Sequence, residues 1–132
     1  MAFQVEFVSP EDSLYSGQAT QVVARTKGGG EIAFLEGHEP FVGSLDTCEV
    51  RVTEESGSVV KFAVRGGFVS VAGKKVTVLS NGAIPANDID VSVAREQLTT
   101  AEAALTSDSE DDGAKADKKW AQVQLTTAGV DV

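Results

Sequence analysis

The chain of 132 residues is poor in several residue types that mark particular functional classes. It has one cysteine, Cys48, so no disulfide can form within the chain, and a reducing compartment fits this. It has one histidine, His38, whereas zinc and copper sites usually recruit several histidine or cysteine ligands. We therefore expect no metal site, and we interpret Cys48 as a small buried apolar residue.

Long hydrophobic runs and an excess of positive charge are also absent. No apolar run approaches the roughly 18 residues that a membrane-spanning helix needs. Residues 1–6 lack the basic and apolar regions of a secretory signal. The formal net charge of −9 argues against a nucleic-acid binder, because phosphate contacts need a basic face. It also disfavours adsorption to anionic lipid, so we expect membrane contact only through partner proteins.

What the first part of the chain does contain is hydrophobic alternation with a period of two. Such alternation places one row of side chains in a core and the other in solvent, as in half-buried strands. Turn-forming residues separate the runs at short intervals, which predicts antiparallel strands in a sandwich or barrel. The clearest alternating runs are residues 3–7, 48–52, 60–64 and 76–78.

The period changes after Pro85. Apolar residues then recur at intervals of three and four, which predicts two helices of roughly 15 residues each. Asn87 and Asp88 are the N-cap candidates of the first helix, residues 106–113 the loop, and Gly129 the stop signal. The first helical stripe contains Val91, Ala94, Leu98, Ala101 and Leu105, and the second contains Ala116, Trp120 and Val123.

Charge density changes at the same place as the period. Residues 1–86 carry 10 acidic and 7 basic side chains (net −3), and residues 87–132 carry 10 and 4 (net −6). We therefore predict a β-sandwich domain over residues 1–86 and a helical hairpin domain over residues 87–132. Because isolated helices of this length are marginal in water, we expect the hairpin to rest on another surface.

The residues show no set of groups that converges on catalysis or on a cofactor. No Gly-x-Ser-x-Gly elbow accompanies His38, and no Gly-Lys-Ser/Thr follows the glycines at 28–30, which we interpret as a hairpin turn. The acidic run at 108–112 does not match a calcium loop. The residues alone favour a binding or structural role, and they leave open a free-standing β-sandwich ligand-binding module or, less favoured, an enzyme.

Several motifs, taken in order, resemble the epsilon subunit of F-type ATP synthases over nearly the whole chain. Ile89-Asp90 at the start of the first helix is similar to that family, whereas Ala33 and Glu36 depart from its pattern. The motifs that carry the resemblance are Val8-Ser9-Pro10, Leu14-Tyr15-Ser16-Gly17, Gly30-Glu31-Ile32, Gly37-His38-Glu39-Pro40, Gly66-Gly67-Phe68-Val69-Ser70-Val71 and Val76-Thr77-Val78-Leu79.

The resemblance implies a non-catalytic rotor subunit in the central stalk of a proton-translocating ATP synthase. The β-sandwich would link the gamma subunit to the c ring and couple ion flow to ATP synthesis. The hairpin would fold against the sandwich or extend toward the catalytic head, where it restrains ATP hydrolysis. Such a switch needs two packings of similar free energy. The implied location is the cytoplasmic face of the plasma membrane, peripheral and within the complex.

The resemblance also assigns candidate contact residues. ATP binding in some relatives uses Ile/Leu-Asp-x-x-Arg-Ala at the hairpin, and here Val93 replaces the arginine, so we expect ATP binding through Ile89 and Asp90 to be weak or absent. Because the hairpin carries only 4 basic side chains against 10 acidic ones, we expect its inhibition of ATP hydrolysis to be modest and salt-sensitive. The candidates are Glu31, Glu36, His38 and Glu39 for the c ring and gamma, and Arg95, Lys115, Lys118 and Lys119 for the beta subunit.

Overall fold

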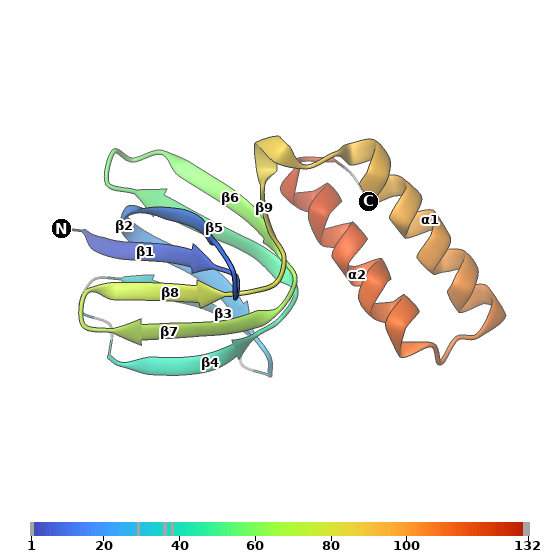
Figure 1. The fold of residues 1–132 in the computed structure, drawn as a ribbon, viewed down its shortest axis with the longest axis horizontal. Helices are drawn as coiled ribbons and strands as arrows, with labels where there is room; N and C mark the ends of the chain where they lie inside the picture. Colours follow the sequence, from blue (N-terminus) through green and yellow to red (C-terminus); the bar gives the residue numbers. More distant parts are fainter. Residues whose placement is uncertain (1, 29, 36, 38, 131–132) are drawn as a thin grey trace.

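The computed structural model describes residues 2–28, 30–35, 37 and 39–130. Within these residues a β-sheet structure is followed by two antiparallel helices at one of its ends (Figure 1). The strands are β1 (Phe3–Val8), β2 (Ser13–Thr26), β3 (Gly30–Leu35), β4 (Phe41–Leu45), β5 (Cys48–Glu54), β6 (Val59–Val64), β7 (Gly67–Ala72), β8 (Lys75–Leu79) and β9 (Ala83–Pro85). A 3₁₀ turn (Ala86–Asp88) leads to α1 (Val91–Ser107) and α2 (Asp112–Thr127).

The strands form two layers. Strands β1, β8, β7 and β4 lie in one layer, and β3, β5, β6 and β9 lie in the other (Figure 1). Strand β2 has 14 residues and pairs with β1 in its first half and with β3 and β5 in its second, with a register shift between Ala19 and Gln21. Such irregularities let one strand bend between two packed layers.

The predicted antiparallel sandwich is therefore confirmed, with one exception. Strands β1 and β8 run parallel, with Gln4 opposite Lys75 and Val8 opposite Leu79. A tight hairpin can join only antiparallel neighbours, but these two strands are connected through the whole of the intervening sheet. The predicted turn at residues 28–30 joins β2 to β3, and Gly28 and Gly30 adopt φ values of 75° and 73°. Gly29 lies outside the described residues.

The core lies between the two layers, and the alternation in the sequence identifies it correctly. An aromatic cluster occupies its centre: the Phe7 and Phe62 rings are 4.4 Å apart, and the Tyr15 ring is 5.0 Å from Phe62. Cys48 is buried, as predicted. The side chains predicted to face inward and found buried are Phe3, Val5, Phe7, Cys48, Val50, Val52, Phe62, Val64, Val76 and Val78.

The helices begin at other caps than those predicted. Asn87 and Asp88 are not N-caps, because they lie in the 3₁₀ turn that follows Pro85. Instead the Asp90 carboxylate accepts a hydrogen bond from the Val93 N–H at 3.2 Å. The Asp111 carboxylate caps α2 in the same way, since it accepts from the Ala114 N–H at 3.0 Å. Aspartate is favoured at this position because it satisfies a backbone donor that the helix leaves free.

The loop between the helices is also shorter than predicted, since it covers residues 108–111 rather than 106–113. The second stripe is wrong at Ala116, which is exposed. The buried positions of α2 are shifted because Trp120 faces the sandwich as well as α1; they are Ala114, Trp120, Ala121, Gln124, Leu125 and Thr127. Gly129 ends α2 as predicted, with φ 83° and an N–H bonded to the Thr126 carbonyl at 3.0 Å.

The hairpin rests on the sandwich in this structure. Helix α2 packs against β5 and β6, and α1 lies on the far side of α2 (Figure 1). Gln124 on α2 donates to Gln97 on α1 at 2.9 Å. The expectation that the hairpin needs a supporting surface is met by the end of the sandwich. The exact division of the chain into domains at residue 86 stays a prediction.

Candidate functional site

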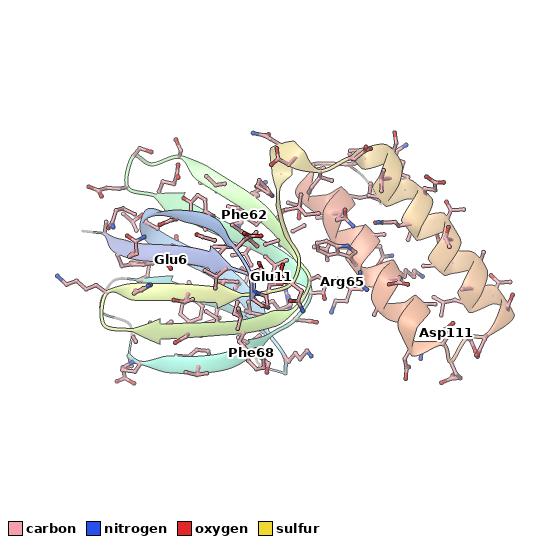
Figure 2. The ribbon with its side chains drawn as sticks, in the orientation of Figure 1. Glu6, Glu11, Phe62, Arg65, Phe68 and Asp111 are labelled. Carbon is pink, nitrogen blue, oxygen red and sulfur yellow. The ribbon has the colours of Figure 1, made fainter. Side chains whose placement is uncertain are left out.

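The layer formed by β1, β8, β7 and β4, together with the first half of β2, carries on its outer face a row of apolar side chains. We call this row the apolar strip: Leu14, Val8, Leu79, Phe68 and Val42. Phe68 on β7 is directly opposite Leu79 on β8, and Leu79 is opposite Val8 on β1. Val42 on β4 is opposite Ser70 and therefore diagonal to Phe68. Phe68 is 55% exposed and Val42 is 75% exposed. Figure 2 shows Phe68 in this layer, at the end of the sheet nearer the helices.

The strip exists because these residues stand at the outward positions of strands whose inward positions are also apolar. Val69 and Val78 fill the core from the same strands, so Phe68 and Leu79 cannot face inward. Soluble proteins rarely expose contiguous apolar patches without a partner for them. The strip is therefore a candidate protein interface, and the sequence analysis missed it. The available signal was Phe68, an aromatic residue out of phase with the buried Val69 and Val71.

The residues predicted to contact the c ring and gamma are only partly described. Glu31 lies on β3, where its carboxylate pairs with Arg51 at 3.1 Å and with Arg25 at 3.8 Å. Glu39 is exposed in the segment between β3 and β4. Glu36 and His38 lie outside the described residues. Of the described residues in this set, Glu31 is engaged in ion pairs within the sandwich, and Glu39 is an exposed acidic residue in the segment after β3.

The cations predicted to contact the beta subunit do not form one group. Lys115 pairs with Glu110 and Asp112 beside the interhelical loop, at 3.8 and 3.9 Å. Lys119 faces the sandwich instead. Arg95 is exposed on α1 and Lys118 is half-buried on α2. Their role toward a partner stays a prediction.

Two ion pairs of opposite polarity join the hairpin to the sandwich. The Lys119 ammonium lies 2.6 Å from the Asp46 carboxylate, and the Arg65 guanidinium lies 2.7 Å from the Asp117 carboxylate. Arg65 also lies over the Trp120 ring, 5.9 Å from its centroid. Figure 2 shows Arg65 at the junction between the sandwich and the helices. We call Lys119–Asp46 and Arg65–Asp117 the docking pairs.

The docking pair at Asp46 changes the pKa of the Asp46 carboxyl. Burial alone would raise the pKa of the Asp46 carboxyl, but the hydrogen bond and charge of Lys119, together with the Thr47 N–H, lower it below its ordinary 3.8. Because the pKa is lower in the docked state, this contribution to docking is present above pH 3.8. It is lost as the pH falls through the docked-state pKa.

We expect Lys119→Ala to raise the pKa of Asp46, because it removes the charge that stabilises the carboxylate. Carboxyl chemical shifts followed by NMR against pH would measure this. The docking free energy should fall by about 0.2–1 kcal/mol, since the pair is partly solvated. Lys115→Ala is the matched control and should leave the Asp46 midpoint unchanged. Equal midpoints in wild-type protein and Lys119→Ala would contradict the assignment.

The residues considered for nucleotide binding have structural roles here. Asp90 caps α1 through the Val93 N–H, and Ile89 follows the 3₁₀ turn. Val93, at the position where the resemblance implies an arginine, is 44% exposed and supplies no cation for a phosphate. The described geometry therefore gives no support to an ATP site at these residues.

The perturbed ionisable groups of the sandwich also have structural causes. Burial, followed by the 2.7 Å hydrogen bond to Glu54 and the charge of Glu54, raises the pKa of Tyr15 to about 12. Burial raises the pKa of the Cys48 thiol, so the nucleophilic thiolate is disfavoured. Among the described residues, no three or more histidine, cysteine and carboxylate side chains are grouped to hold a metal ion. Neither described helix is long and apolar enough to cross a membrane.

The chain is similar to known proteins along its length. Residues 2–86 match the family "ATP synthase, Delta/Epsilon chain, beta-sandwich domain". The chain is 46% identical to the ATP synthase epsilon chain of Brevibacillus brevis over 102 residues, which is 77% of this chain and 76% of that relative. It is 41% identical to the epsilon chain of Thioalkalivibrio sulfidiphilus over 125 residues, 94% of this chain and 84% of that relative.

A solved structure shows the same fold. It is the Euglena gracilis mitochondrial ATP synthase, described as OSCP/F1/c-ring, with a TM-score of 0.69 and 23% identity to one of its chains. The match covers 95% of this chain and 76% of that one. From the match of its sandwich and its identity to epsilon chains, this chain belongs to the delta/epsilon chain family of ATP synthases.

Proposed function

We propose that the chain is a rotor subunit of the ATP synthase central stalk that links the gamma subunit to the c ring. The observation that carries this proposal is the apolar strip, because a subunit that rotates with gamma needs a permanent interface. Obligate interfaces are more apolar than ordinary protein surface. The related chain in the Euglena structure belongs to an assembly that contains a c-ring, which supports the same role. In this role the subunit helps couple proton flow to ATP synthesis.

The apolar strip is the proposed contact for gamma. Five side chains from five adjacent strands, β2, β1, β8, β7 and β4, give it the breadth that a side-by-side protein contact requires. The segment that joins β3 to β4, which contains Glu36, His38 and Glu39, is the proposed contact for the c ring, together with Glu31 near the start of β3. The Glu31 carboxylate already pairs with Arg25 and Arg51. It would therefore present to that ring a carboxylate whose charge is balanced within the chain.

The hairpin is the proposed restraint on ATP hydrolysis, through Arg95, Lys115, Lys118 and Lys119 and the beta subunit. Lys119 is paired with Asp46 while the hairpin is docked, so it is available to a partner only after undocking. Because the docking pairs are partly solvated, salt weakens both these pairs and any later contact. We therefore propose modest, salt-sensitive inhibition. We propose that the chain lies peripherally at the membrane within the complex, on the cytoplasmic face.

The apolar strip gives a direct test of the assembly role. Phe68→Glu places a charge within the strip, between Leu79 and Val42, where burial against gamma would leave it unpaired. We expect the affinity for gamma to fall by at least about 100-fold, which corresponds to about 2.8 kcal/mol. The measurement is co-purification of the chain with gamma, followed by titration of the purified partners.

Val59→Glu is the control for this experiment. Val59 on β6 is as exposed as Phe68, at 55%, but it stands on the other layer of the sandwich. Its substitution should leave the association with gamma unchanged. If Phe68→Glu binds gamma like the wild-type chain, or if Val59→Glu is equally damaging, the strip is not the gamma contact.

A further inference from the structure

A groove runs between the two helices on the face that also touches Arg65. It encloses about 550 Å³ and is lined along α1 by Val93, Ala101 and Ala104 and along α2 by Gly113, Ala114 and Trp120. Most of these side chains are small, so another backbone can approach the helix pair closely. A channel between two helices with such walls fits the ridge of a third helix.

The charges on the rim of the groove have one dominant sign. Glu96 on α1 and Asp111 at the start of α2 line it, and Asp117 does so as well. Arg65 is the cation among the described lining residues, and the Asp117 carboxylate neutralises it at 2.7 Å. Figure 2 shows Arg65 and Asp111 some distance apart beside α2, so the acidic end at Asp111 is not covered by the arginine.

We propose that this groove binds an amphipathic helix with a basic flank, supplied by a partner protein. The apolar ridge of that helix would pack on the small residues, and its lysines or arginines would face Glu96 and Asp111. Charge complementarity decides the occupant: a nucleotide would bring phosphates to an acidic rim, and a second copy would bring another hairpin region of net charge −6. This inference is independent of the proposed contact with gamma through the apolar strip.

Trp120 makes the proposal measurable, because it is the one tryptophan of the chain and it lines the groove. Two synthetic helical peptides would be titrated into the full-length protein. They would share the same apolar positions, and one would carry lysine and the other glutamate on the flanks. We expect saturable changes in tryptophan emission with the basic peptide, at least about 10-fold tighter binding than with the acidic one, and weakening by added salt.

Two pairs of variants test the position of the helix. Thr100 lines the groove and the neighbouring Thr99 does not, although both are exposed. Thr100→Phe should fill the groove and weaken binding at least about 10-fold, and Thr99→Phe should not. Glu96 lines the groove and the exposed Glu102 does not, so Glu96→Lys should weaken the basic peptide more than Glu102→Lys. Circular dichroism would verify that all four variants stay folded.

Three results would overturn the proposal. The first is the absence of a saturable change in Trp120 emission with the basic peptide. The second is equal affinity for both peptides, or equal effects of the variants in each pair. The third is a change in Trp120 emission on adding ATP or a small amine, with no change on adding the basic peptide. That result would make the groove a small-ligand site. Binding to gamma through the strip would be unaffected by any of these outcomes.

Discussion

Gly67→Ala is expected to destabilise the sandwich by about 4 kcal/mol or more, enough to unfold a marginally stable domain. Gly67 begins β7 with φ 123°, a conformation that L side chains rarely adopt. A Cβ at this position would overlap the carbonyl oxygen of Leu79 and lie 3.0 Å from its carbonyl carbon. Both atoms belong to the backbone of the paired strand β8, so no side-chain rotation can relieve the clash.

Gly73→Ala is the matched control for this prediction. Gly73 also has a positive φ, 60°, in the turn between β7 and β8, but an added Cβ there meets no atom within 4 Å. It should cost only about 1–2 kcal/mol, from the backbone conformation alone. Chemical denaturation followed by circular dichroism measures both variants. Equal stability of the two variants would show that the close approach at Leu79 does not matter.

Trp120→Ala is expected to release the hairpin from the sandwich while the sandwich stays folded. The Trp120 side chain is 8% exposed, and its ring passes so close to Gly82 that a Cβ there would lie 3.8 Å from it. Removing a buried tryptophan costs about 3–5 kcal/mol, whereas partly solvated ion pairs such as the docking pairs contribute about 0.2–1 kcal/mol each. The docking pairs alone therefore cannot hold the hairpin.

Hydrogen–deuterium exchange would measure this release. We expect faster exchange throughout α1 and α2 in Trp120→Ala, and unchanged protection in β5 and β7. Val93→Ala is the control, because Val93 lies on α1 and is 44% exposed, so it should leave exchange of the hairpin nearly unchanged. Unaltered protection of the helices in Trp120→Ala, or loss of protection in both parts together, would show that the hairpin does not dock through this side chain.

Some features of the chain could be predicted from the sequence because they depend on neighbours along the chain. The alternation of Phe3, Val5 and Phe7 determines one face of β1 whatever that strand pairs with. Gly129 ends α2 through the backbone conformation of a single residue. The helix start was missed because Asn87, Asp88 and Asp90 are all good caps, and only the 3₁₀ turn after Pro85 selects the last.

The candidate surfaces depended on contacts between residues far apart in the sequence. Phe68, Leu79 and Val8 become neighbours only through the pairing of β7, β8 and β1, which includes the parallel pair that local spacing could not reveal. Nothing in the sequence indicates that Lys119 pairs with Asp46, because the two residues are 73 positions apart. Only the packing of α2 on the sandwich brings them together.

By itself, the sequence determined the two kinds of secondary structure, the buried side of the strands and the family. The first two follow from the local periodicity of apolar residues, and the family follows from the order of its motifs. Only the tertiary structure decided which outward apolar residues join into one strip and which charges are used within the molecule. It also decided where the hairpin rests. The physical reason is that pairing between distant segments brings side chains together at distances the order of residues does not encode.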